Sequence, residues 1–356
     1  MARDDGTPEA DRLEGVAHPR EADALIGQDA AEAAFLDAYR GGRFPHAWIL
    51  GGPEGVGKAT FAYRAARFVL AHPDPTSSAV AMATTLAVPH DNPVAQRVRA
   101  QAHTSLFVVR RQMSADKATM PTRIPVDLVR KAVTSFFGSS AGEGGWRVCI
   151  VDHAEDLNVQ GANALLKMVE EPPARCLFLI VSHLPGRLLP TIRSRCRLLR
   201  FRSLSEAEIT AVLVSAAGGP DPETACRAAA LAAGSVRDAW KVLDGETLPI
   251  VEHIRATLER LPQVDWTDIH AIADGLAGRS NDRAFETAMG TVFGWLGEQA
   301  RGRAGEGAAR LAPLAEVWDK IARTARETEA YNLDRRAFVL TLYSDLSAAL
   351  RVSRAG

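Results

Sequence analysis

A glycine-rich segment, Gly52-Pro-Glu-Gly-Val-Gly-Lys58, has the residue types and spacing that bind phosphate. It follows a short apolar run, Ala47 to Leu50, and precedes a run with helical periodicity, which is the context that a phosphate loop requires. Glycines let backbone N–H groups approach an anion, the helix start favours negative charge, and Lys58 adds an ammonium group. The segment therefore predicts a phosphate-binding loop, and the alternative is a glycine-rich turn with an incidental lysine.

The position after Lys58 lacks the expected metal ligand. A phosphate loop of this type places Ser or Thr there to bind Mg²⁺, and this chain has Ala59. Thr60 lies one residue further along the helix, rotated by about 100° from that position. The predicted nucleotide-contacting residues of the loop are Gly52, Gly55, Val56, Gly57, Lys58, Ala59 and Thr60.

A second acidic segment departs from the same chemistry. The apolar run Val148 to Asp152 predicts a buried strand that ends in an acid suited to hold hydrated Mg²⁺. The next residue is His153, where a catalytic glutamate would polarise water. A histidine can act as a base, but departures in two separate elements favour impaired hydrolysis. Whether ATP binds at all stays open.

The elements that position these residues alternate between strand and helix. Strands are predicted over 47–50, 106–109, 147–151, 176–181 and 196–201, and helices over 28–39, 58–70 and 159–170, with Pro125 opening another. Such alternation is typical of an α/β doubly wound parallel sheet. Residues 72–104, which carry several prolines, predict an irregular insertion, and after Ser203 only helical patterns follow.

Composition excludes several classes of protein. The chain has 356 residues, 47% of them hydrophobic, and a formal net charge of −1, so electrostatics of the whole chain give no argument for nucleic-acid binding. The cysteines, Cys149, Cys176, Cys196 and Cys226, are too widely spaced for a zinc site or a disulfide framework. The N-terminus has no signal-peptide pattern, and no apolar run reaches the ~18 residues that a spanning helix needs. A cytoplasmic location is expected.

Four further segments make the sequence similar to a known family. They are Gly41 to Trp48, Asp152 to Asn158, Asn163 to Pro173 and Thr191 to Cys196. With the phosphate loop, these segments resemble the clamp-loader branch of the AAA+ proteins, and most closely the delta-prime subunits of bacterial DNA polymerase III. The resemblance covers about Leu25 to Trp240, and the Asn163 helix followed by Ser194-Arg195-Cys196 is its most specific part.

The resemblance implies roles for several residues. Arg195 would be an arginine finger that reaches the γ-phosphate bound by a neighbouring subunit, where a permanently charged guanidinium stabilises phosphoryl oxygens. Ser182 and His183 stand where the family has its first nucleotide sensor, and Arg237 stands where it has the second. The alternative for Ser182, His183 and Arg237 is an ordinary polar residue. The alternative for Arg195 is a surface arginine, because Arg193, Arg197 and Arg200 also lie near it in the sequence.

The family pattern also implies domain limits. We expect a mobile N-terminal tail over 1–23, an AAA+ P-loop domain over 24–203, a helical lid over 204–247 and an all-α C-terminal domain over 248–356. By resemblance, the last domain is the collar through which loader subunits form a ring. Its apolar stripes, Phe285, Met289, Val292 and Leu296, then Phe338, Leu342 and Leu346, fit an ordinary helical core equally well.

One departure concerns metal. Some delta-prime proteins carry a four-cysteine zinc module after the P-loop helix, but residues 72–104 contain no cysteine. His72, His90 and His103 are interpreted as loop residues, because they have no thiolate or acidic company. The expected metal site is therefore none, with no zinc, and ATP is the candidate cofactor.

The resemblance implies a function in DNA replication. The chain is expected to be a stator of the DNA polymerase III clamp loader, within a DNA-directed DNA polymerase (nucleotidyltransferase) assembly, and to have little intrinsic ATPase. Expected partners are gamma/tau and delta-type subunits, the sliding clamp and primer-template DNA, with no membrane. The alternatives are an ATP-hydrolysing gamma/tau-like motor subunit and a free-standing AAA+ remodeller.

Overall fold

The computed structural model describes residues 16–112, 121, 123–138, 145–243, 247–277, 282–303, 305–331 and 333–355. The chain divides into two compact units. The first contains the described residues up to Pro220 together with Gly234–Arg237, and the second contains Asp221–Ala233 and the described residues from Asp238 onward. The predicted domain limits at 203 and 247 stay a prediction.

A five-stranded parallel sheet forms the centre of the first unit. Its strands are β1 (Ala47–Gly51), β2 (Leu106–Val109), β3 (Arg147–Val151), β4 (Cys176–Ser182) and β5 (Arg197–Arg200). Their order is β2-β3-β4-β1-β5, and each neighbouring pair is parallel. All seven residues of β4 are buried, as the nearly continuous apolar run predicts for a central parallel strand.

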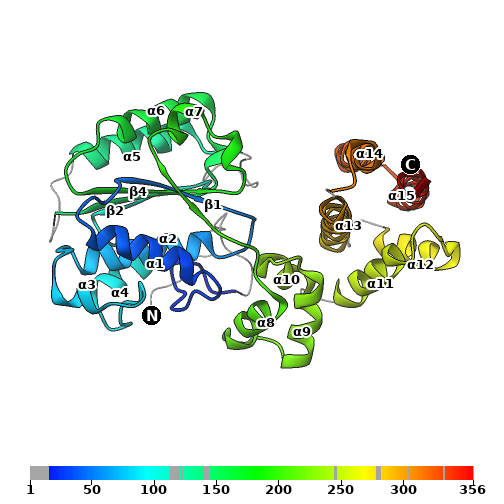
Figure 1. Cartoon of the computed structure of the whole chain (residues 1–356), viewed down its shortest axis with the longest axis horizontal. Helices are drawn as coiled ribbons and strands as arrows, with labels where there is room; N and C mark the ends of the chain where they lie inside the picture. The colour runs from blue at the N-terminus through cyan, green and yellow to red at the C-terminus, as the bar shows by residue number, and fades with distance from the viewer. Residues whose placement is uncertain are drawn as a thin grey trace. The chain divides into compact units, whose positions relative to one another are not determined.

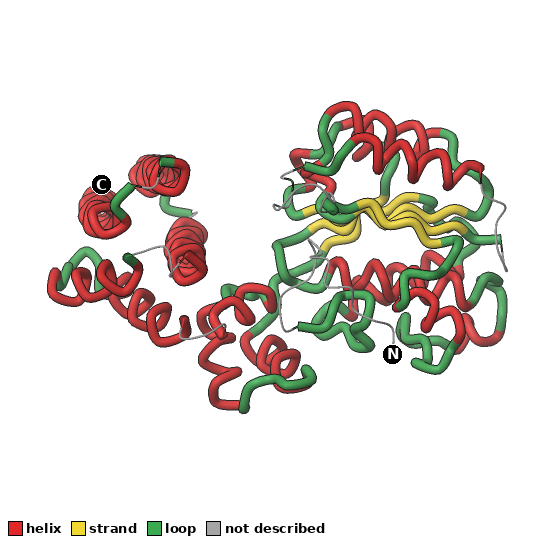
Figure 2. The backbone as a smooth tube through the Cα atoms, turned by 180° about the vertical axis from the view of Figure 1, so that it is seen from behind, coloured by secondary structure: helices red, strands yellow, loops and turns green. Residues whose placement is uncertain are grey.

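Helices cover both faces of this sheet (Figures 1 and 2). One layer contains α1 (Asp29–Arg40), α2 (Lys58–Ala71), α3 (Ser78–Met82) and α4 (Pro93–Arg99), and the other contains α5 (Val126–Gly138), α6 (Val159–Glu170) and α7 (Pro190–Arg193). Two short 3-10 turns, η1 (Ala154–Asp156) and η2 (Pro185–Arg187), follow β3 and β4. The predicted fold class, a doubly wound α/β sheet of the P-loop type followed by helices, is confirmed.

Two apolar cores hold these layers to the sheet. On the α1/α2 side, Phe35 packs edge-on against Phe44 and Phe61 with ring centroids 5.2 and 5.5 Å apart. On the α5/α6 side, Leu165 and Met168 lie fully buried in a second cluster beneath the sheet. Each such side chain contributes roughly 1.5–3 kcal/mol by leaving water, so the edge where the strands end is rigidly supported.

The end of the predicted N-terminal tail is packed against the first unit. His18 is fully buried, Arg67 donates to the backbone oxygens of Arg20 and Ala22, and Arg64 donates to that of Asp23. Residues 1–15 of that tail lie outside the described residues. The segment 16–23 therefore docks on α2.

Helix α8 (Glu206–Ser215) completes the first unit and begins with a capping box between Ser205 and Glu208. Gly234–Arg237, which opens α10 (Val236–Leu243), belongs to the same unit. The four cysteines, Cys149, Cys176, Cys196 and Cys226, are free thiols.

The second unit is helical in its described residues. It contains α9 (Pro222–Leu231), the rest of α10, α11 (Thr247–Glu259), α12 (Trp266–Leu276), α13 (Asp282–Gly302), α14 (Ala308–Ala330) and α15 (Arg335–Ala355). The two predicted apolar stripes lie together in its core, with Phe285 and Phe338 ring centroids 5.8 Å apart. Across the part of the chain that the structure describes, no helix combines the length and the apolar character needed to cross a membrane.

Candidate functional site

The predicted site residues gather where β1, β3 and β4 end. Gly51 pairs with Ser182 across β1 and β4, and Val151 pairs with Ile180 across β3 and β4. Parallel strands end at the same edge of a sheet, and ligands of such sheets bind at this edge near the point where the strand order reverses. The loop after β1, the acid after β3 and the polar pair at the end of β4 therefore meet.

The loop between β1 and α2 has the backbone of a phosphate cradle. Gly55 and Gly57 have φ of +73° and +95°, a region that favours glycine, and Gly57 caps α2. A Cβ at Gly55 would lie 2.2 Å from Ser235 Oγ. The Gly55 carbonyl also accepts a hydrogen bond from Val236 N–H at 3.0 Å, so the 234–237 segment closes directly over the loop.

Lys58 turns back onto its own loop. Its Nζ donates to the carbonyl oxygens of Gly52, at 2.7 Å, and Pro53, and the side chain is 3% exposed. Burial lowers the pKa of Lys58 to about 8, and the nearby carboxylates of Glu54, Glu155 and Asp152 oppose that shift. The Lys58 ammonium group therefore forms hydrogen bonds with carbonyl oxygens of its own loop.

The next residues test the fit of a magnesium nucleotide. Ala59 and Thr60 are half-buried in the first turn of α2, and the Ala59 side chain has no oxygen to offer a metal. Val56 is buried in the core beneath the loop, and its carbonyl accepts from Gln28 Nε2 at 3.2 Å. The cradle therefore fits a phosphate anion, whereas the metal ligand that normally follows the lysine is missing.

Asp152 and His153 follow β3. Asp152 is 3% exposed; its Oδ2 lies 3.1 Å from Nδ1 of His153, and its Oδ1 has no hydrogen bond from a described residue. Burial lowers the pKa of His153, but the contact with Asp152 and the charges of Asp152, Glu54 and Asp156 outweigh it, so the pKa is raised overall. A buried carboxylate oxygen without a donor is costly, so Asp152 has one oxygen left to interact with a cation or a proton donor.

Ser182 and His183, at the end of β4, contact different groups. Ser182 is fully buried, and its hydroxyl donates to Glu155, which also accepts from Leu184 N–H at 2.7 Å. His183 faces His153, with ring centroids 4.4 Å apart and the planes at 69°. Burial, followed by the charges of Lys58 and His153, lowers the pKa of His183 to about 4, so its ring is neutral at pH 7.

Arg237 reaches the loop from the start of α10. Its Nε lies 3.2 Å from Oε1 of Glu54, a loop residue that the sequence patterns did not single out. The predicted second sensor therefore lies beside the phosphate loop and is engaged by a carboxylate. Its role toward a nucleotide stays a prediction.

Arg195 lies two residues after the end of α7. Its side chain is 41% exposed and pairs with Glu170 at the end of α6. Nη1 also donates to the backbone oxygen of Thr191 at 3.0 Å. Among the neighbouring arginines, Arg197 stacks over the Trp48 ring at 5.0 Å.

Sequence reasoning missed three residues that shape the site. Gln28 Nε2 donates to the carbonyl oxygens of Val56 in the loop and of Arg202 after β5. Glu54 pairs with Arg237, and Glu155 accepts a hydrogen bond from the Ser182 hydroxyl. Glu54 and Glu155 had a sequence signal, because Glu54 lies within the phosphate-loop segment and Glu155 lies three residues after Asp152 within one of the family segments. Gln28 could be found only from contacts between distant segments.

The chain is similar in sequence to subunits of DNA polymerase III. The chain is 37% identical over 151 residues to DNA polymerase III subunit delta-prime of Pseudomonas aeruginosa, covering 42% of this chain and 41% of that protein. It is 31% identical over 189 residues to the gamma/tau subunit of Mycobacterium bovis, covering 53% and 30%. The chain thus matches less than half the length of either relative.

Solved structures and a family model complete the comparison. A gamma-subunit-related protein of Thermotoga maritima has 16% sequence identity and a TM-score of 0.40, with 90% of this chain and 100% of that one covered. The model of the family described as DNA polymerase III, delta subunit, matches residues 27–205, which is half of the 356-residue chain. The chain belongs to this family, in agreement with its delta-prime relatives.

Proposed function

We propose that this chain acts in DNA replication as a stator subunit of a DNA polymerase III clamp loader. In this role it supplies Arg195 to the nucleotide site of a neighbouring ATPase subunit and hydrolyses little ATP itself. The proposal is supported by family membership and by relatives described as delta-prime and gamma/tau subunits.

The observation that carries the proposal is the pair of defects at one phosphate loop. Ala59 has no hydroxyl for a metal, and His153 occupies the position of the water-polarising acid, with its ring held 3.1 Å from Asp152. Lys58 already satisfies the loop carbonyls. The cradle is therefore compatible with binding a phosphate anion, and we propose that it serves docking rather than turnover.

Arg195 is suited to act on a neighbour. Its guanidinium carries five N–H donors, two of its nitrogens are held by Glu170 and the α7 backbone, and the side chain remains partly exposed. A guanidinium held in this way is pre-oriented for a planar anion. A trans-acting arginine of this kind raises the rate of phosphoryl transfer by about 10³–10⁵-fold.

The proposed partners follow from the same role. They are gamma/tau and delta-type subunits, the sliding clamp and primer-template DNA, in the cytoplasm. The helical region 248–356 is proposed as the collar that joins subunits into a ring, with a lid over 204–247. The buried core of the helical region 248–356 would stabilise that region as a surface for contacts between subunits.

The decisive measurement is the ATPase rate of a reconstituted loader, stimulated by clamp and primer-template DNA. Arg195→Ala is expected to lower the rate by at least tenfold while the loader still assembles. Arg193→Ala removes the exposed arginine that ends α7, two residues before Arg195, and serves as the matched control. An unchanged rate with Arg195→Ala, or an equal loss in both variants, would contradict the finger.

The second candidate is an ATP-hydrolysing motor subunit, favoured by the 31% identity to a gamma/tau protein. Intrinsic ATP hydrolysis by the isolated chain separates the two roles, because a stator is expected to show only background turnover. Hydrolysis by the isolated chain that DNA stimulates strongly would instead indicate a free-standing remodeller.

A further inference from the structure

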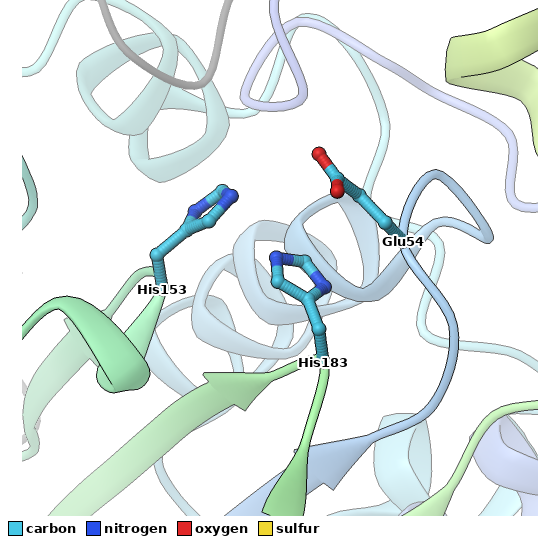
Figure 3. Close-up of side chains that lie close together, drawn as sticks. All are labelled: Glu54, His153 and His183. Carbon is cyan, nitrogen blue, oxygen red and sulfur yellow. The ribbon is translucent and has the colours of Figure 1, made fainter. Parts of the chain in front are cut away.

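Three side chains with metal-binding atoms converge beside the phosphate loop. They are Glu54 from the loop, His153 after β3 and His183 after β4, and one ligand atom from each lies within 4.8 Å of the others. Figure 3 shows the two imidazoles and the carboxylate directed toward a common space. Three segments separated by many residues therefore present two nitrogens and an oxygen to one point.

The surrounding residues orient these ligands. Asp152 Oδ2 lies 3.1 Å from His153 Nδ1, an arrangement that fixes the proton on Nδ1 and leaves Nε2 as the metal-binding atom. Carboxylates hold metal-binding histidines in this way in many zinc sites. Arg237 Nε lies 3.2 Å from Oε1 of Glu54, which holds this carboxylate near the start of α10.

His183 gives an independent sign that a partner belongs at this point. Both of its ring nitrogens are buried, and neither has a hydrogen bond from any residue that the structure describes. Buried polar atoms are nearly always paired in native proteins, so the unpartnered ring of His183 indicates a ligand that supplies the missing interactions.

We propose that Glu54, His153 and His183 form a binding site for a divalent transition metal of the zinc class, with water as the fourth ligand. Two imidazoles and a carboxylate are a common donor set for Zn²⁺. Zn–N and Zn–O bonds of about 2.0–2.2 Å place the ligand atoms of a tetrahedron about 3.4 Å apart. Small side-chain rotations close the present gaps.

This site differs from the one that a magnesium nucleotide would use. Mg²⁺ prefers oxygen ligands, and the hydroxyl it would need after Lys58 is absent at Ala59. Nitrogen ligands at 153 and 183 instead select a softer ion. The sequence led us to expect no metal site and no zinc, because residues 72–104 contain no cysteine; the proposed site departs from that expectation, lies elsewhere and uses no cysteine. The inference does not depend on the proposed role in clamp loading.

The test is metal binding by the full-length chain. Protein stripped with a chelator is dialysed against Zn²⁺, the bound metal is counted by mass spectrometry, and affinity is measured by competition with a chelating dye. Wild type is expected to bind one Zn²⁺ per chain, whereas His153→Gln and His183→Gln lose stoichiometric binding. Asp152→Asn is expected to weaken binding by about 10–100-fold, because it removes the group that orients a ligand.

His90→Gln is the matched control, since His90 is an exposed loop histidine outside the site; it is expected to bind like wild type. Co²⁺ in place of Zn²⁺ should give a visible absorption spectrum of mixed nitrogen and oxygen ligation that both site variants lose. Glu54→Gln alters an exposed loop residue and tests the site even if a histidine variant unfolds. Failure of wild type to bind Zn²⁺, or retention of full binding by Glu54→Gln or by folded histidine variants, would overturn the proposal.

Discussion

Nη2 of Arg195 lies 3.0 Å from Oε1 of Glu170, which fastens the proposed finger to the end of α6 in its own chain. The pair joins the last residue of α6 to the segment that follows α7, and both side chains stay more than a third exposed. Glu170 therefore orients Arg195 without burying it. Because the pair is exposed, the fold does not depend on Arg195, and the function of this side chain can be tested without unfolding the chain.

Removing this pair should hardly affect stability. Exposed ion pairs contribute about 0–1 kcal/mol, so Arg195→Ala and Glu170→Gln are each expected to lower the free energy of unfolding by no more than about 1 kcal/mol. Urea unfolding followed by circular dichroism measures this quantity. A loss several times larger would mean that Arg195 is structural, and its loader ATPase result would then need a different explanation.

The buried Lys58 predicts a pH dependence of stability. Its pKa is lowered from 10.5 to about 8 in the folded chain, so between these values the unfolded chain binds more protons than the folded chain. The free energy of unfolding then rises with pH across that window, while the cost of holding charged Lys58 is constant below pH 8. The shift corresponds to about 3 kcal/mol.

The Lys58→Met variant isolates this effect. The free energy of unfolding of wild type minus that of the variant should be flat below pH 8 and then rise by up to about 3 kcal/mol toward pH 10.5. Lys131→Met, at an exposed position of α5, is the control and should give a flat difference. A flat difference for Lys58→Met as well would show that its pKa is not lowered.

Gly42 and Gly55 have nearly the same left-handed backbone, so alanine at each position separates the cost of backbone strain from the cost of side-chain crowding. Gly55 and Gly42 have φ of +73° and +70°, but a Cβ at Gly55 would meet Ser235 and Arg237, whereas at Gly42 it would meet nothing within 4 Å. Gly42→Ala should cost about 1–2 kcal/mol for the left-handed backbone. Gly55→Ala should lower the free energy of unfolding by about 1–3 kcal/mol more, because the added methyl group overpacks the site. Thermal unfolding measures both losses. Equal losses would mean that the 234–237 segment moves aside freely.

Restoring the two missing groups should restore turnover. The variant Ala59→Thr/His153→Glu supplies a hydroxyl after Lys58 and an acid after Asp152, and its intrinsic ATP hydrolysis is expected to exceed that of wild type by about 100-fold, the lower end of general-base contributions. Ala59→Thr alone should stay near background. Wild-type turnover well above background would contradict the proposed stator role, and background turnover in the double variant would show that these two positions are not what limits hydrolysis.

Local sequence patterns were sufficient for most elements. The strands 106–109 and 147–151 and the helix 159–170 begin and end where predicted, and the other predicted strands shift by a residue. These elements are fixed by runs of apolar residues and by adjacent glycine and proline, which act over a few residues. Short helices were missed: residues 72–104 contain α3 and α4, although Asn92 before Pro93 is a helix-start signal.

The sequence by itself determined the chemistry that is present and absent: a phosphate loop with Lys58, no hydroxyl at Ala59 and no acid at His153. Only the tertiary structure decided which groups meet. The pair of Arg195 with Glu170 depends on how two separate segments pack, and the convergence of Glu54, His153 and His183 depends on the order β2-β3-β4-β1-β5. Periodicity encodes the face of each element but not its neighbours, because strand order is set by the packing of the whole sheet.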